Sequence, residues 1–163
     1  MNKLNVSDII RELDEKLPNF SDGRVDYTKS DYAPVISVFV KYGDEILLLK
    51  RSETVRHYKS FWNVVGGYLD EIRPMRLKVL EEVEEELNIT ESQIASIKFG
   101  EPFEFKDKKI NKTWFVHPVL VVLKEKVNIK LDWEHIEYKW IKIDQLSKYK
   151  TIPNLKMSLE NLI

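Results

Sequence analysis

The feature that most constrains this chain is a glycine pair, Gly66 and Gly67, followed by a segment with the pattern of a helix. Glycines let the backbone approach a ligand closely. Pro74 suits the first position of the helix, where a missing N–H costs nothing, and Asn88 suits the left-handed residue that ends one. Apolar side chains at helical spacing predict the face that packs on the core: Val79, Leu80, Val83 and Leu87.

A second face of the same predicted helix is acidic. Glu82, Glu85 and Glu86 follow the spacing i, i+3, i+4, which brings neighbouring side chains to about 5–6 Å and makes their charges repel. Magnesium takes oxygen ligands and prefers a few carboxylates together with substrate phosphates, so such a cation would remove the repulsion. A solvated acidic face is the alternative interpretation, and most glutamate runs on helices are of that kind.

The residues around the glutamates favour the metal site. The stretch Gly67–Ile89 resembles the Nudix box, G-x5-E-x7-R-E-U-x-E-E-x-G-U, in which U is aliphatic. The matching positions are Gly67, Glu82, Val83, Glu85, Glu86 and Ile89. Residues 47–51, 61–67 and 134–140 also resemble family segments. Because several spaced elements agree in order, the chain resembles the Nudix hydrolase family over roughly residues 34–145.

Three positions depart from the box. Arg73 stands where the motif has its first glutamate, Glu81 where it has arginine, and Asn88 where it has the late glycine. The first two read as one exchange, so we predict that Arg73 and Glu81 form a charge-swapped salt bridge that braces the loop against the helix. The exchange places a positive charge at the helix start, which the helix dipole disfavours by about 0.3–1 kcal/mol. A decayed enzyme is the other interpretation of the same exchange.

The resemblance implies a fold and a reaction. The fold is α/β: a Nudix-type α/β/α sandwich with a mixed sheet, here with an extra N-terminal helix. The reaction is Mg²⁺-dependent hydrolysis of the diphosphate linkage of a nucleoside diphosphate derivative, with Mn²⁺ as the other candidate ion. A Nudix-fold module that binds a nucleotide without cutting it is the alternative. The resemblance leaves the substrate open among nucleoside triphosphates, ADP-sugars and dinucleoside polyphosphates.

The resemblance also implies the site residues. The expected metal ligands are the Gly66 carbonyl and the side chains of Glu82, Glu85 and Glu86, which with Glu134 form the expected catalytic set. Either Glu82 or Glu134 could take the proton of the attacking water, and Glu137 is the second choice for the late carboxylate. Arg51 and Arg56 are the expected substrate-binding residues, because a guanidinium suits phosphate oxygens. His57 and Lys59 in the same loop could help to steer an anion.

We expect two parts along the chain: residues 1–33, and a Nudix hydrolase domain over residues 34–163, within one globular unit. A helix is predicted over residues 7–17 with Ser7 as its N-cap, followed by a surface connection over residues 19–33. The later elements are strands at 35–40, 45–51, 93–99, 103–106, 113–123 and 138–143, and a last helix from residue 153. The basic turn at 107–112 reads as a charged tip that keeps a sheet edge soluble.

Composition excludes several classes of function. The net charge of -1 provides no basic field for nucleic acid. The absence of cysteine excludes disulfides, thiolate zinc sites and a cysteine nucleophile. No stretch reaches the ~20 apolar residues that span a bilayer, and the N-terminus lacks the apolar run of a signal peptide, so a cytoplasmic location is expected. The expected partner is a small nucleotide, and a homodimer is left open because dimers are common in the family.

Overall fold

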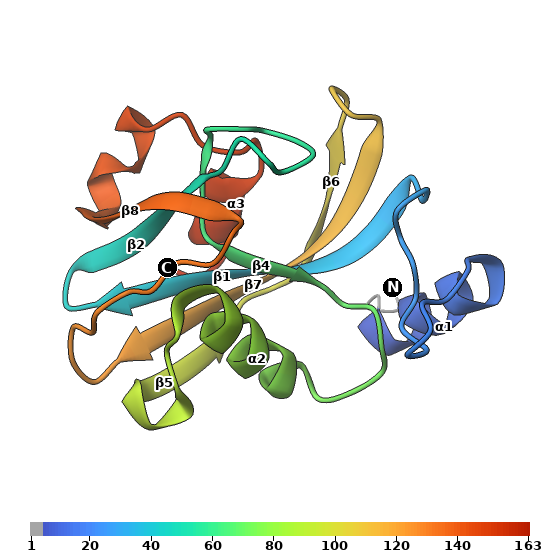
Figure 1. Cartoon of the computed structure of the whole chain (residues 1–163), viewed down its shortest axis with the longest axis horizontal. Coiled ribbons are helices and arrows are strands. Elements are labelled where there is room, and N and C mark those ends of the chain that lie inside the picture. The colour runs from blue at the N-terminus through green and yellow to red at the C-terminus, as the bar shows by residue number, and fades with distance from the viewer. Residues whose placement is uncertain (1–4) are drawn as a thin grey trace.

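Two long parallel strands, β1 (Tyr32–Tyr42) and β7 (Lys112–Leu123), run side by side through the middle of the molecule (Figure 1). The computed structural model describes residues 5–163. Its other strands are β2 (Glu45–Arg51), β3 (Trp62–Asn63), β4 (Val65–Tyr68), β5 (Ile94–Phe99), β6 (Phe103–Asp107) and β8 (His135–Lys142). The helices are α1 (Val6–Lys16), α2 (Met75–Leu87) and α3 (Leu155–Glu160), with short 3-10 turns η1 (Glu91–Gln93) and η2 (Ile143–Lys148).

The strands form one eight-stranded sheet over the described residues, in the order β3-β2-β1-β7-β5. On either side of this path β4 pairs with β1, β6 with β7 and β8 with β2. The β1–β7 pair is parallel and the other pairs are antiparallel. The mixed sheet that was expected is therefore confirmed, and the β1–β2 hairpin and the β6–β7 hairpin lie where the sequence predicts them.

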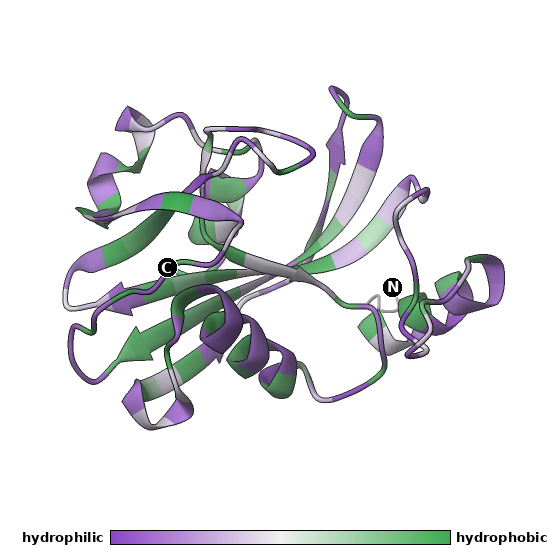
Figure 2. Cartoon of the chain, in the orientation of Figure 1, coloured by the Kyte–Doolittle hydropathy of each residue, from purple (hydrophilic) through white to green (hydrophobic). Residues whose placement is uncertain are grey.

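Helices cover both faces of this sheet. On one face the predicted apolar side of α2 packs into the core, with Val79, Val83 and Leu87 at 0% exposure and Leu80 partly buried. On the other face Leu155 and Leu159 of α3 pack against Phe39 of β1 and its neighbours. The central strands are mainly hydrophobic, whereas both helices carry polar residues as well (Figure 2). The α/β/α sandwich is confirmed, because each helix buries one apolar stripe against the sheet.

The helix ends differ from the predictions by small shifts. α2 begins at Met75, and Pro74 is its N-cap instead of its first helical residue. Asn88 ends α2 in the left-handed conformation, with φ 59° and ψ 34°, as predicted. The N-cap of α1 is Asn5 and not Ser7, because the Asn5 side chain accepts the Ser7 backbone N–H at 2.8 Å.

The segment between α1 and β1 is not the surface connection that its polar composition predicts. Val25 and Tyr27 are each 2% exposed and belong to the same hydrophobic cluster as the α2 stripe. The Tyr27 hydroxyl donates to the carbonyl of Leu69 at 2.7 Å, and the Val25 N–H donates to the carbonyl of Asp70 at 2.9 Å. These contacts attach the segment to the loop between β4 and α2. The division into residues 1–33 and 34–163 stays a prediction.

Over the described range, residues 5–163, the chain has no helix that is both long and apolar enough to cross a membrane.

Candidate active site

The glycine pair allows the glutamates of α2 to approach the sheet. Gly66 and Gly67 lie in β4, opposite Ser37 and Ile36 of β1. The Gly66 N–H donates to Oε2 of Glu86 at 3.2 Å. A Cβ atom on Gly67 would lie 2.7 Å from Cδ of Glu82, which is too close for two carbon atoms.

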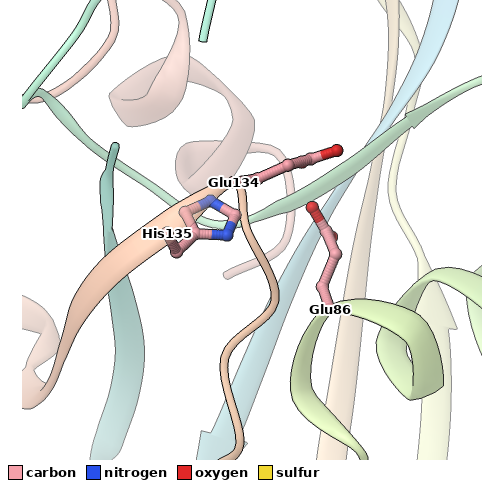
Figure 3. A group of neighbouring side chains, drawn as sticks. All are labelled: Glu86, Glu134 and His135. Atoms are coloured by element: carbon pink, nitrogen blue, oxygen red, sulfur yellow. The ribbon is translucent and has the colours of Figure 1, made fainter. Parts of the chain in front are cut away.

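A group of three side chains, two buried and one half-buried, lies at the end of α2. Glu86, Glu134 and His135 offer ligand atoms that all lie within 4.8 Å of one another. The carboxyl groups of Glu86 and Glu134 approach each other from α2 and from the start of β8, and the His135 ring lies beside them (Figure 3). His135 was not predicted as a site residue. A helical spacing rule cannot reach it, because it comes from a distant part of the chain.

The electrostatics of this group are unfavourable without a cation. Glu86 is 3% exposed. Burial, reinforced by hydrogen bonding and charge repulsion from Glu134, raises the pKa of Glu86 well above its ordinary value. Both ring nitrogens of His135 are buried without a hydrogen-bond partner. Burial, together with the charge of Arg51, lowers the pKa of His135 to about 4, so the imidazole is neutral and could serve as a ligand.

A second group lies further toward the start of α2. Glu81, Glu82 and Glu85 also offer oxygens within 4.8 Å of one another. Here the chain supplies its own cations: Oε1 of Glu82 lies 2.8 Å from Nζ of Lys78, and Glu81 is ion-paired with Arg73. The structure therefore brings together the exchanged residues Arg73 and Glu81. Burial raises the pKa of Glu82, while Lys78 opposes that shift.

The donor set fits a divalent hard cation. Carboxylate oxygens such as those of Glu86 and Glu134 are the ligands that Mg²⁺ accepts. Within residues 5–163 no lysine or arginine nitrogen lies within ion-pair distance, 4.0 Å, of the carboxyl groups of Glu86 or Glu134. A buried carboxylate such as that of Glu86 is costly when no counter-charge contacts it. We conclude that the residues present suit a metal ion, with Glu85 at the exposed edge of the site.

A cavity of about 460 Å³ opens beside this site, lined by Glu82, Glu85 and Glu134 but not by Glu86, which lies behind them. Its lining combines acidic groups with cations and aromatic rings, and includes Gly66, Gly67, Glu82, Glu85, Glu134, Arg51, Arg56, Lys112, Tyr68 and Trp114. Acidic residues that can bind a metal and basic residues that can bind an anion thus line one space. That combination suits a substrate that is itself anionic.

The two predicted substrate-binding arginines both line this cavity. Arg51 closes β2, as predicted, and its Nε and one Nη donate to the carbonyl of His57 at 3.1 and 2.8 Å. These bonds hold the 52–60 loop and leave part of the guanidinium for a ligand. Arg56 donates to the carbonyl of Thr28 at 3.4 Å. His57 also lines the cavity, whereas Lys59 is not among the residues that do.

The tip of the β6–β7 hairpin contributes residues that sequence reasoning missed. Nζ of Lys112 lies 4.7 Å from the centre of the Trp114 ring and 5.5 Å from the centre of the Tyr68 ring. The centres of these two rings lie 6.1 Å apart, and the Tyr68 ring also lies 5.5 Å from the ring of Tyr27, measured between centres. The tip is therefore a cavity wall as well as the predicted charged turn. The available signal was the spacing of Lys112 and Trp114, which puts both on one face of a strand.

Comparisons with known proteins agree with this site. The family model described as the NUDIX domain matches residues 31–161. This match spans most of the sequence, so the chain belongs to the Nudix family. It is a Nudix-type pyrophosphohydrolase, as the box at Gly67–Ile89 predicts. A comparison with curated proteins found no match.

Solved structures with the same fold are also similar to this chain. The chain is similar to a C. elegans Ap4A hydrolase in a binary complex, with 21% identity, a TM-score of 0.65, and coverage of 80% of this chain and 94% of that one. It is also similar to a MutT protein from Methanosarcina mazei Go1, with 25% identity, a TM-score of 0.60, and coverage of 79% and 91%. A third is a bifunctional NMN adenylyltransferase/ADP ribose pyrophosphatase from Francisella tularensis, complexed with AMP and a manganese ion. The two chains share 17% identity with a TM-score of 0.64, and the match covers 96% of this chain and 46% of that one.

Proposed function

We propose that this chain hydrolyses the diphosphate linkage of a nucleoside diphosphate derivative, with Mg²⁺ or Mn²⁺ as the cofactor. The observation that carries the proposal is the approach of the buried Glu86 carboxyl group to that of the half-buried Glu134, with no lysine or arginine of the described residues within ion-pair distance of either. Two such carboxylates are stable together only when one is protonated or when a metal lies between them. The mixed acidic and basic lining of the cavity supports an anionic substrate.

The proposed ligands are the carboxylates of Glu86 and Glu134. Gly66, Glu82 and Glu85, which the sequence also predicted as ligands, line the same cavity as Glu134. A divalent ion supplies charge neutralisation at the phosphate oxygens and lowers the pKa of bound water. The chain itself holds the water: Glu82 and Glu134 are the two candidates for its general base. A positioned base contributes about 10²–10⁴-fold in rate.

The other residues of the cavity bind the two ends of the substrate. Arg51 and Arg56 suit phosphate oxygens, because a guanidinium can donate two parallel hydrogen bonds. Tyr68 and Trp114 suit the nucleoside, because every nucleobase has a flat face that can stack on an aromatic ring. The Ap4A hydrolase and the ADP ribose pyrophosphatase among the similar structures act on substrates of this general type. We therefore propose Ap4A, ADP-ribose and nucleoside triphosphates as the substrates to test first.

The test is product release from this panel with Mg²⁺ and with Mn²⁺. We expect turnover by the wild-type protein and a loss of at least about a hundredfold in Glu86→Gln, which removes a proposed ligand but keeps its shape. Glu84→Gln is the matched control, because Glu84 lies on the same helix, is exposed and belongs to neither carboxylate group.

Equal turnover by Glu86→Gln and the wild type would overturn the proposed site. Nucleotide binding without turnover on every member of the panel would replace the hydrolase with a nucleotide-binding module. The ion pair between Arg73 and Glu81 argues against a decayed enzyme, because the exchanged charges still contact each other. The cytoplasmic location, the homodimer and the lack of nucleic-acid binding stay predictions.

A further inference from the structure

Lys78 is a buried cation inside the acidic site. It lies on α2, one turn before Glu82, and only 4% of the residue is exposed. Its Nζ lies 2.8 Å from Oε1 of Glu82, whose side chain is 13% exposed. Both residues line the cavity. A buried lysine is rare and costly unless an anion compensates it, so this pair is a specific feature of the site.

The acidic groups of the site divide into two sets by their counter-charges. In the first set each carboxylate contacts a cation of the chain: Glu81 pairs with Arg73, Glu82 with Lys78, and Asp70 with Arg24 at 3.4 Å. In the second set, Glu85, Glu86 and Glu134, no such cation lies within 4.0 Å anywhere in the described chain, and of these three only Glu86 is buried. Each carboxylate of the first set is thus in contact with a cation, whereas the second set has only the more distant charge of Arg51.

We propose that Lys78 is a positioning residue that acts as a fixed cation beside Glu82, so that divalent ions bind at Glu86 and Glu134 and are disfavoured at Glu82. This inference rests on the proposed function, because it concerns the ions of that same site. Lys78 occupies one oxygen of Glu82 and adds a positive charge that any ion placed there would meet. The site therefore holds fewer ions, or holds them more weakly, than its carboxylates would allow.

The experiment measures metal binding without substrate. Apo protein is titrated with Mn²⁺ alone, and bound ions are counted by calorimetry and by the electron paramagnetic resonance of free Mn²⁺. We expect Lys78→Met, which keeps the length of the chain but removes the charge, to bind Mn²⁺ at least about tenfold more tightly or to bind one further ion. Lys78→Arg keeps the charge and should behave as the wild type.

Arg76→Met is the matched control. Arg76 is an exposed cation of the same helix and pairs with Glu91 at 2.7 Å, away from the acidic groups of the site. We expect no change in Mn²⁺ binding. The double variant Lys78→Met/Glu82→Gln should lose the gain, because the additional affinity depends on the Glu82 carboxylate.

Unchanged Mn²⁺ binding in Lys78→Met, or an equal gain in Arg76→Met, would overturn the inference. Circular dichroism checks that each variant folds, and Lys78→Gln replaces Lys78→Met in the same titration if the latter does not. The proposed function fails separately. If the wild type hydrolyses no nucleotide but Lys78→Met still binds Mn²⁺ more tightly, the proposed reaction is contradicted and the role of Lys78 is supported.

Discussion

A single missing side chain lets Glu82 lie directly on β4. In Gly67→Ala the new Cβ would lie 2.7 Å from Oε1 and Cδ of Glu82, so the carboxylate must move. Because the obstructing atoms belong to the end of a flexible side chain, we expect a small loss of stability. We expect kcat to fall on the order of a hundredfold, since a displacement of about 1 Å at a reacting group has that effect.

Steady-state kinetics and a melting curve check this prediction. Gly66→Ala provides the comparison, because a Cβ on Gly66 would meet its nearest atom, the carbonyl oxygen of Ile36, at 3.4 Å. Its kcat should fall less. A Gly67→Ala enzyme as active as the wild type would show that the position of Glu82 is not required.

His117 makes the stability of the fold depend on pH. It lies in β7, packs edge-on against Phe115 at 4.9 Å between ring centres, and leaves Nε2 without a hydrogen bond. Burial lowers its pKa from 6.5 to about 4. Between these values the unfolded chain binds a proton and the folded chain does not, so stability falls as the pH is lowered from about 6.5 to 4.

We expect His117→Gln to flatten this pH dependence. Urea unfolding at several pH values between 4 and 7 measures the unfolding free energy against pH. The slope in the wild type should exceed that in His117→Gln by at most about 1.4 kcal/mol per pH unit. His135, whose pKa is also lowered to about 4, leaves a remaining slope in the variant. An identical slope in both proteins would contradict the assignment to His117.

At the scale of the elements, the exchange of Arg73 and Glu81 at α2 departs from the family pattern but keeps an ion pair between the two positions. Arg73 precedes the helix and Glu81 lies within it, with 26% and 38% of the side chains exposed. For a partly exposed pair we expect a coupling energy of about 0.5–1 kcal/mol. Arg73→Glu and Glu81→Arg should each destabilise the protein, and the double variant should recover most of the loss. Urea unfolding of the four proteins measures the coupling, and purely additive losses would contradict a functional brace.

The β6–β7 hairpin and β4 together supply the aromatic wall of the cavity. Tyr68 is 40% exposed there, so its ring is available to a ligand. We expect Tyr68→Ala to raise KM and leave kcat nearly unchanged, because a stacked base contributes about 1–3 kcal/mol of binding. Initial rates over a range of nucleotide concentrations separate the two constants. Tyr42→Ala is the control, because Tyr42 is similarly exposed, at 37%, but does not line the cavity.

For the molecule as a whole, the site weakens the fold until a cation is bound. Because the pKa of Glu86 is raised, the folded chain binds its proton more tightly than the unfolded chain, so ionising Glu86 at neutral pH costs stability. We expect metal-free Glu86→Gln to melt above the metal-free wild type at pH 7. This advantage should vanish below the ordinary glutamate pKa, about 4.3.

Added Mg²⁺ or Mn²⁺ should reverse the order. An ion that binds the folded wild type raises its melting temperature. At a concentration one hundred times Kd it adds about 2.7 kcal/mol to the free energy of unfolding. Glu86→Gln should gain less. Melting curves with and without metal test this, and equal shifts in both proteins would place the ion away from Glu86.

Much of the fold and half of the site could be predicted from the sequence, because they depend on neighbours along the chain. Helical geometry alone places Glu82, Glu85 and Glu86 on adjacent turns and Val79, Val83 and Leu87 on the core side. The left-handed stop at Asn88 follows from the backbone preference of that one residue. Arg73 and Glu81 could be paired because their exchange is visible within one short motif.

Only the tertiary structure decided which distant residues meet these. The family resemblance had placed Glu134 in the catalytic set, but Glu134 and His135 reach Glu86 because β8 pairs with β2 and begins beside the end of α2. The wall at Trp114 exists because β7 lies beside β1 and carries the hairpin over the cavity. The burial of Lys78 could not be predicted from the sequence either, because a lysine is usually exposed at the surface. Local spacing determines which side chains share a face, whereas burial and the choice of a long-range partner depend on how the sheet and helices pack.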